Sequence, residues 1–214
     1  MNRTKIEWTD GTINPIKGRC RFGCDYCYAR KMYRRFKWDP SIRLDLQVFE
    51  GLALMKPCRV FVCSTHEMYG DWIQKEWIGI ILKMIEKFPQ ITFQILTKNP
   101  ERATLFFYPK NVWLGTTINR QDELDRMEIL KHTDARIKFI SFEPLFEEIN
   151  TDSDGHSLDG IDWIIIGSQT QPYRPPKKEW VDLLIEQAEA QGIPIFLKNN
   201  LKWRTWKRQE FPSV

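Results

Sequence analysis

Three cysteines within eight residues are the part of this sequence with the clearest chemical meaning. Cys20, Cys24 and Cys27 follow the spacing C-x3-C-x2-C, which five cysteines placed at random in 214 residues would rarely produce. Three thiolates on a short loop suit a soft metal centre. They would satisfy three irons of a [4Fe–4S] cubane and leave the remaining iron open to a non-protein ligand. Gly23, inside the loop, is expected to adopt the positive φ that a tight turn needs.

The cysteine spacing, with the aromatic Tyr26 immediately before the third cysteine, resembles the cluster loop of radical S-adenosylmethionine enzymes. The resemblance implies that the open iron binds the amino and carboxylate groups of S-adenosylmethionine. Electron transfer would then cleave the sulfonium and give a 5′-deoxyadenosyl radical. The resemblance also implies that Tyr26 lies near the adenine ring.

A structural zinc site is the alternative interpretation of the three cysteines. His66, Cys58 or Cys63 would then supply the remaining ligand. Zinc motifs more often use a pair of C-x2-C knuckles, and this sequence has no second knuckle. On this interpretation the chain is a zinc-stapled nucleic-acid-binding module without catalysis.

The elements that must position the cysteines alternate between short β-branched segments and longer amphipathic ones. Strands are predicted at 12–15, 59–63, 91–97, 112–118, 136–142, 162–167 and 193–197, and helices at 72–88, 100–107, 120–132 and 178–191. This alternation predicts an α/β fold with parallel strands. A complete eightfold barrel needs about 250 residues, so 214 residues predict a partial (β/α)6-type TIM barrel. We expect one radical SAM-like domain over 1–214, with a cluster loop at 20–27, a surface loop at 150–159 and a basic C-terminal extension at 198–214.

Polar side chains follow the predicted strands, at the edge of a barrel that normally carries the active site. His66 and Glu143 are the candidates for catalysis, by proton transfer or by substrate contact. Pro144 holds Glu143 in an extended conformation at its strand end. The corresponding structural interpretations are a surface-loop histidine and a salt bridge on the rim.

Two further resemblances concern the cofactor residues. Over the cysteine loop and the next four strands, the chain is similar to the spore photoproduct lyase branch of radical S-adenosylmethionine enzymes. This implies that Lys98 contacts the cofactor carboxylate and that Thr117 contacts its ribose or carboxylate. It also implies that Ser64 and Glu67 lie near the cofactor amino group. A closer resemblance, to a phage- and bacteria-encoded radical-SAM-like family of unknown function, rests on residues 6–10, 96–98, 112–115, 141–145 and 162–167.

Two basic segments interleave cations with aromatic side chains. Residues 30–38 contain five cations and three aromatic residues, and residues 198–208 contain five cations, Trp203 and Trp206. Each segment's charge of +5 exceeds the +4 of the whole chain, so the remainder is net acidic. Such segments suit a phosphate backbone with stacked bases, or they form helices whose aromatic side chains face the core. A nucleobase in DNA or RNA is therefore a candidate substrate.

The sequence also bounds the partners and the compartment. No apolar region follows the N-terminal charges, and the longest apolar stretch, 77–85, is too short to span a bilayer. We expect a cytoplasmic enzyme with no membrane partner that receives electrons from a flavodoxin- or ferredoxin-type donor. Cys58 and Cys63 flank a predicted buried strand and are expected to pack in the core. The substrate, the product and the oligomeric state stay open.

Overall fold

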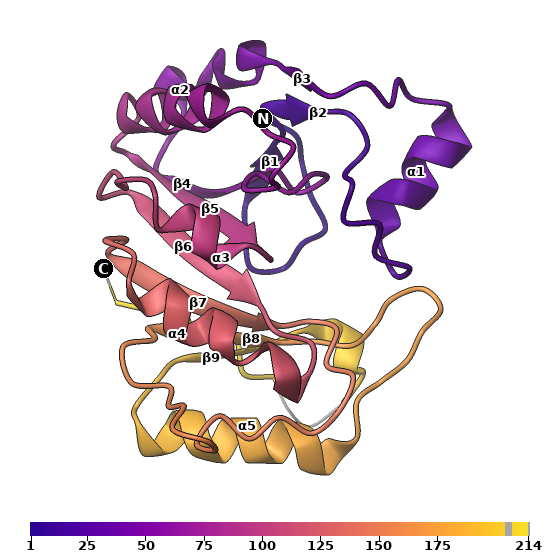
Figure 1. Ribbon diagram of the computed structural model, residues 1–214, viewed down its shortest axis with the longest axis vertical. Coiled ribbons are helices and arrows are strands. Elements are labelled where there is room, and N and C mark those ends of the chain that lie inside the picture. Colours follow the sequence, from indigo (N-terminus) through magenta and orange to yellow (C-terminus); the bar gives the residue numbers. More distant parts are fainter. Residues whose placement is uncertain (204–206, 214) are drawn as a thin grey trace.

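The protein has an α/β fold in which a parallel sheet curls into a half-barrel (Figure 1). The computed structural model describes residues 1–203 and 207–213. Within these residues seven strands form one sheet, in which every adjacent pair is parallel. In spatial order they are β1 (Gly11–Ile13), β4 (Cys58–Val62), β5 (Ile91–Thr97), β6 (Val112–Thr117), β7 (Ile137–Phe142), β8 (Trp163–Ile166) and β9 (Ile195–Leu197). Because all these strands are parallel, their carboxyl ends form one rim.

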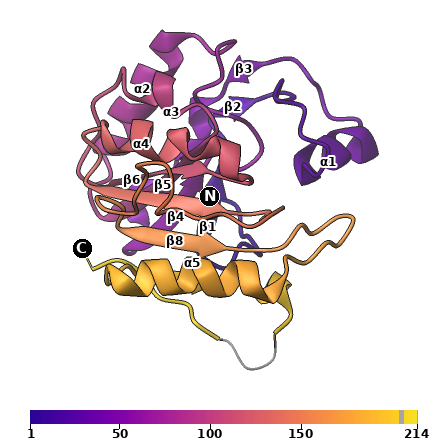
Figure 2. The same ribbon diagram turned by 60° about the horizontal axis from the view of Figure 1, so that its bottom comes forward.

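Helices pack on the outer face of the sheet and bury apolar side chains against it (Figure 2). They are α2 (Lys75–Glu86), α3 (Pro100–Ala103), α4 (Asp125–Lys131) and α5 (Lys178–Ala190). In α2 the buried side chains are Ile78, Ile81, Leu82 and Ile85, the spacing that places apolar residues on one helical face. The remaining helix of the described chain, α1 (Tyr28–Phe36), lies apart from this layer and buries Ala29 alone (Figure 1).

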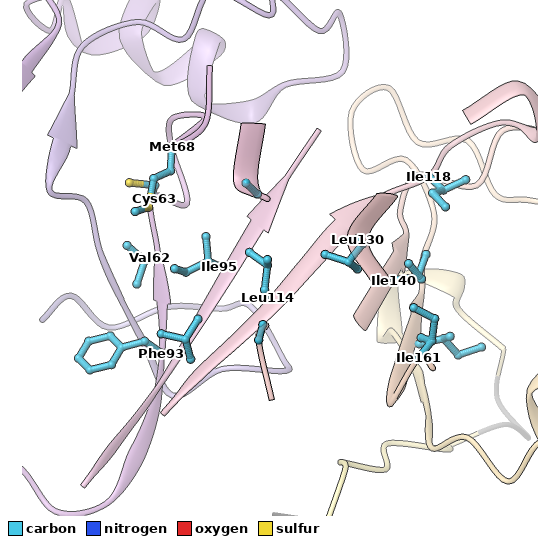
Figure 3. Packing of buried hydrophobic residues seen from close by; sticks show 14 of the residues in the cluster. Val62, Cys63, Met68, Phe93, Ile95, Leu114, Ile118, Leu130, Ile140 and Ile161 are labelled. Carbon is cyan, nitrogen blue, oxygen red and sulfur yellow. The ribbon is translucent and has the colours of Figure 1, made fainter. Parts of the chain in front are cut away.

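Alternate residues of each strand face opposite sides of the sheet, which gives the half-barrel two apolar layers. The outer layer, under the helices, includes Val62, Ile95, Leu114 and Ile140 (Figure 3). The inner layer is aromatic and consists mainly of Trp8, Phe61, Trp113, Phe139, Trp163 and Phe196. The Trp163 ring lies 5.4 Å from that of Phe139 and 6.3 Å from that of Trp8, centroid to centroid. Aromatic side chains therefore fill the inner side of the sheet, and the rim is left for function.

Each edge strand of the sheet is paired with a segment near a chain end. Asn2 and Thr12 exchange backbone hydrogen bonds of 2.9 and 3.0 Å beside β1. At the other edge, Leu197 donates to the Arg208 carbonyl at 2.7 Å, and Glu210 donates to the Ile195 carbonyl at 3.0 Å. Both outer strands therefore have backbone partners on their exposed sides.

The predicted strands are confirmed, most closely at β5, where the bounds coincide with the prediction. The helices are shorter than predicted. The segment predicted at 100–107 ends as a helix at Ala103, because the Tyr108 hydroxyl donates to the Ala103 carbonyl at 2.9 Å and the chain turns away. The segment predicted at 120–132 divides into a 3₁₀ turn, Gln121–Glu123, and α4.

The connection from β7 to β8 departs from a regular barrel. Residues 143–162, all of them described, contain turns and bends but no helix. The predicted surface loop at 150–159 belongs to this connection, although Thr151 and Leu158 are buried. No helix in the described chain has both the length and the apolarity needed to cross a membrane.

Two glycines predict opposite effects of the same substitution. Gly79 lies inside α2, and apart from its chain neighbours and the adjoining helix backbone no atom lies within 4 Å of the place that an alanine methyl group would take. Gly79→Ala should therefore stabilise the fold by about 0.5–1 kcal/mol through helix propensity. Gly115 lies in β6, and a Cβ there would stand 2.5 Å from the Phe139 ring. Gly115→Ala should therefore destabilise the fold by about 1–3 kcal/mol. Urea unfolding of both variants checks this, and changes of the same sign would contradict the packing described for the inner layer.

Candidate functional site

The three cysteines lie on a loop that leaves the carboxyl end of β1. A short antiparallel pair, β2 (Ile16–Lys17) with β3 (Arg43–Leu44), holds the base of this loop. Gly23 has a φ of 71°, which confirms the predicted turn conformation. The Cys27 N–H donates to the Cys24 carbonyl at 3.1 Å, and Cys27 then caps the first turn of α1. The positive end of the helix dipole favours negative charge at this position.

Cys20 lies against the start of the loop that follows β4. Burial raises the pKa of its thiol, while hydrogen bonds from the backbone N–H groups of Phe22 and Glu67 act in the opposite direction. The charges of Glu67 and Cys27 also raise this pKa. Two N–H donors aimed at one sulfur would stabilise a thiolate bound to a metal.

Asn119 joins two of the predicted cofactor residues. Its Oδ1 accepts a hydrogen bond of 2.9 Å from the Tyr26 hydroxyl and one of 2.7 Å from Lys98 Nζ. Its Nδ2 donates to the Pro144 carbonyl at 2.8 Å. Burial lowers the pKa of Lys98, although the neighbouring Cys24 thiol favours the charged amine. The ammonium group of Lys98 therefore lies at the rim close to the cysteine loop.

Glu67 is buried beside Lys98 and is fully hydrogen-bonded. Its carboxylate accepts from the Thr97 hydroxyl at 2.7 Å, from the Lys98 N–H at 2.9 Å and from the Tyr69 N–H at 3.0 Å. Burial raises the pKa of this carboxyl, and these hydrogen bonds oppose the shift. The side chain thereby fixes the ends of β4 and β5 relative to the Cys20 sulfur.

Two other predicted cofactor residues lie on the same rim. The carbonyl of Ser64 accepts the Tyr28 hydroxyl at 2.7 Å, which links the end of β4 to α1. The Ser64 hydroxyl lies 3.3 Å from Asn14 Oδ1. Thr117, the last residue of β6, is buried, and its carbonyl accepts from Arg126 at 3.0 Å.

His66 has a positioning role in this structure. Its Nδ1 lies 3.0 Å from the Gly18 carbonyl, and its Nε2 accepts from the Trp72 indole N–H at 3.0 Å. Burial lowers the pKa of His66, and the hydrogen bond to Gly18 opposes the shift. Both ring nitrogens are therefore engaged, Nδ1 with the base of the cysteine loop and Nε2 with Trp72 in the loop after β4, and a catalytic role for His66 stays a prediction.

Glu143 forms a polar group with residues that directly follow β8 and β9. Lys198 Nζ lies 2.5 Å from Glu143 Oε1, and Asn200 Nδ2 donates to the same oxygen at 3.0 Å. The Gly167 Cα is close enough that a Cβ there would meet the Glu143 carboxyl carbon at 3.0 Å. The buried Ser168 hydroxyl beside this group has no hydrogen-bond partner among the described residues. Burial raises the pKa of Tyr28, and the charges of Cys27 and Glu143 add to this shift.

Sequence reasoning did not select the three asparagines that organise the site. Asn14 accepts from the Thr65 N–H and hydroxyl at 3.0 and 2.9 Å, while Asn119 and Asn200 make the contacts described above. Each of them comes within three residues of a strand's end, which is the signal that could have identified them.

No three histidine, cysteine, aspartate or glutamate side chains in the described chain are grouped so that they could hold one metal ion. The ligands considered for a zinc site are engaged elsewhere. Cys63 is buried in the outer layer, where burial raises the pKa of its thiol to about 12. Cys58 packs beside the same layer, as predicted. Of the basic C-terminal segment, Arg204 and Trp206 lie outside the described residues.

Comparison with known proteins gives one family. A family model described as "Protein of unknown function (DUF5131)" matches residues 3–212. No curated protein and no solved structure matches the chain significantly.

These findings correct the predicted family. The match is to a family without an assigned function, and the described donors do not converge on one metal position. The recognition of a radical SAM superfamily member, close to a radical-SAM-like phage and bacterial family and more distantly to spore photoproduct lyase, is therefore wrong. Its physical basis was narrow, because the cysteine pattern spans eight residues of the chain. A metal loop of that length can arise in unrelated proteins.

Proposed function

The chain belongs to the DUF5131 family of proteins of unknown function, and we propose from its own residues that it is an iron–sulfur enzyme. In this proposal Cys20, Cys24 and Cys27 bind a [4Fe–4S] cluster, and S-adenosylmethionine binds at the open iron. The observation that carries the proposal is the set of groups around the cysteine loop: three thiols, N–H donors to Cys20, and the Lys98 ammonium beside Cys24.

The donor set fits a cluster better than it fits a single ion. Each cysteine of a cubane binds a different iron, so the three sulfurs do not have to meet at one point. The helix start at Cys27 and the Lys98 ammonium both favour the negative charge of thiolates and sulfides. The absence of a fourth cysteine from the loop matches a cluster with one exchangeable position.

The rim offers groups that suit the parts of S-adenosylmethionine. Lys98 would pair with the cofactor carboxylate. The Tyr26 ring packs edge-on against the Phe146 ring, with centroids 5.4 Å apart, and would pack against the adenine. Ser64 and Glu67 lie on the β4 side for the amino group, and Thr117 lies on the β6 side for the ribose.

Cys20, Cys24 and Cys27 would hold the cluster, which would supply the one electron that cleaves the sulfonium into methionine and a 5′-deoxyadenosyl radical. An external one-electron donor of flavodoxin or ferredoxin type must supply that electron. The chain's own residues would orient the cofactor and exclude water, for which the buried Glu67, Thr117 and Asn119 are suited. Glu143, held by Lys198 and Asn200, would contact the substrate or move a proton.

We further infer that residues 1–214 form a single incomplete barrel domain of the (β/α)6 type. The support is that β1, β4, β5, β6 and β8 are each followed by a helix before the next strand of the sheet. A reducing compartment, the cytoplasm, would suit an enzyme whose cluster must be reduced before it reacts.

Anaerobic reconstitution with iron and sulfide tests the proposed function. We expect about four irons per chain, by the cubane stoichiometry, with visible iron–sulfur absorption. Addition of dithionite and S-adenosylmethionine should then yield 5′-deoxyadenosine. One tightly bound zinc without iron–sulfur absorption would overturn the proposal in favour of a zinc-stapled nucleic-acid-binding module.

A further inference from the structure

The aromatic side chains of α1 and the residues after it lie at the surface. Phe36 is 52% exposed and Trp38 is 42% exposed, and their rings stack with centroids 5.5 Å apart. The Arg35 guanidinium lies over the Phe36 ring at 5.4 Å. The interpretation of this segment as a helix with its aromatic residues in the core is therefore wrong for these two rings. Exposed stacked rings beside cations are suited to a planar, anionic ligand.

A basic cleft is lined by the cysteine loop and by residues 40–42, which closely follow Trp38 in the chain. Its volume is about 490 Å³, and its lining includes Arg19, Cys20, Arg21, Gly23, Arg30 and residues 40–42. Among the described residues no carboxylate forms an ion pair with Arg19 or Arg21. Asp25 lies 4.0 Å from Arg30, and Asp39 is engaged by Arg43 at 2.9 Å. The cleft therefore offers uncompensated guanidinium groups, which suit phosphate oxygens.

The helix that carries the aromatic surface is fixed to the site. The Gly18 N–H donates to the Tyr33 hydroxyl at 2.9 Å, which ties α1 to the start of the cysteine loop. Lys31 Nζ contacts the Gln171 carbonyl at 3.2 Å, which ties α1 to the loop after β8. A ligand on α1 would consequently be held at a constant position relative to the cysteines.

Cations and aromatic rings continue onto the loop after β8. Tyr173 is 41% exposed, and Lys202 Nζ lies 3.8 Å from its ring centroid. Arg174 lies over the Phe146 ring at 5.8 Å, and Phe146 is the ring that packs on Tyr26. The basic and aromatic surface thus extends from α1 across to the rim.

We infer that single-stranded nucleic acid binds along this surface, with phosphates in the arginine cleft and an unpaired base stacked on Phe36 and Trp38. Exposed ring faces can stack on a base only where that base is not already stacked in a duplex, which favours a single strand. The inference deepens the proposed function and rests on it for the chemistry, since it identifies the substrate class of the same site. Binding itself requires neither the cluster nor S-adenosylmethionine.

Fluorescence anisotropy with a dye-labelled oligonucleotide of about twelve nucleotides tests the inference, with a duplex of the same sequence as comparison. With three phosphate contacts, affinity for the single strand should fall at least about tenfold between roughly 50 and 200 mM salt. The variant Arg19→Gln/Arg21→Gln should reduce the logarithmic salt slope by about 1.4, since each contact contributes about 0.7 for single strands. Trp38→Ala should weaken binding about tenfold without changing the slope.

Matched controls lie at the amino-terminal ends of the strands, opposite the rim. Phe107, which is 88% exposed, and Arg136 come shortly before β6 and β7, so they lie at the ends of the strands remote from the cysteines. Phe107→Ala and Arg136→Gln should leave affinity unchanged, and circular dichroism would verify that all variants are folded. Absence of single-strand binding, equal losses in the control variants, or tighter duplex binding would each overturn the inference.

The binding assay also separates this inference from the proposed function. It is run without reductant or S-adenosylmethionine, so a failure to form 5′-deoxyadenosine leaves its result intact. Conversely, normal 5′-deoxyadenosine formation by a protein that binds no oligonucleotide would retain the proposed function and reject the nucleic-acid substrate.

Discussion

Replacing Cys27 with serine is expected to abolish cluster binding, and with it the formation of 5′-deoxyadenosine from S-adenosylmethionine. A serine hydroxyl is a hard, weakly acidic ligand that does not substitute for a thiolate on iron–sulfur centres. After anaerobic reconstitution, iron and sulfide per chain should fall to background and the visible absorption should disappear. This is the largest effect that we expect from a single side chain.

Cys58→Ser is the matched control for that experiment. Cys58 begins β4, is partly buried and packs beside the outer layer, away from the three-cysteine loop. The Cys58→Ser variant should bind iron as the unmodified chain does. Full iron content in the Cys27→Ser variant, or equal losses in both variants, would contradict the assignment of Cys27 as a ligand.

The second large effect is expected at Asn119. Asn119→Ala removes the oxygen that accepts from both Tyr26 and Lys98, and it leaves the Lys98 ammonium without this partner in a largely buried position. Loss of a hydrogen bond to a buried charge should lower the free energy of unfolding by about 2–3 kcal/mol, measured in urea. Binding of S-adenosylmethionine to the reconstituted protein should weaken in the same variant, because Lys98 would lose its orientation.

A double-mutant cycle with Lys98→Met isolates the coupling at Asn119. Once the ammonium is gone, the cost of Asn119→Ala should fall by at least about 1 kcal/mol, because only the hydrogen bonds to Tyr26 and Pro144 are then lost. Additive effects of the two substitutions would show that Asn119 does not hold Lys98. Tyr26→Phe removes only the hydrogen bond from the neutral Tyr26 hydroxyl. In the otherwise unchanged chain it should lower the free energy of unfolding by about 1 kcal/mol.

The strands could be predicted from the sequence because each buried strand is a short local run of apolar and β-branched residues. In β5 the apolar residues Ile91, Phe93, Ile95 and Leu96 are followed by the polar Thr97 and Lys98, and the observed strand ends at Thr97. The strand order also follows from the alternation of strands and helices. The absence of a helix between β7 and β8 was predicted as well, because residues 143–162 are too polar to indicate an element of either kind.

The candidate site was only partly predictable, because its contacts join residues far apart in the chain. The cysteine spacing is local, and so is the turn at Gly23. In contrast, the Tyr26–Asn119 hydrogen bond connects positions 93 residues apart, and the Lys198–Glu143 pair connects positions 55 apart. The curvature of the sheet determines which polar residues at the strand ends come into contact. No local sequence pattern encodes that curvature.

The paired edges of the sheet have a consequence for how this protein behaves in concentrated solution. An open edge strand presents unpaired N–H and C=O groups and can recruit the edge of another molecule, which leads to aggregation. The pairing of Asn2 with Thr12, and of residues 208–210 with β9, occupies the edges that a half-barrel, unlike a closed barrel, leaves open. These two segments therefore protect the two edge strands of the half-barrel against pairing with strands of other molecules. The sheet can in this way remain open without exposing unpaired edges that promote aggregation.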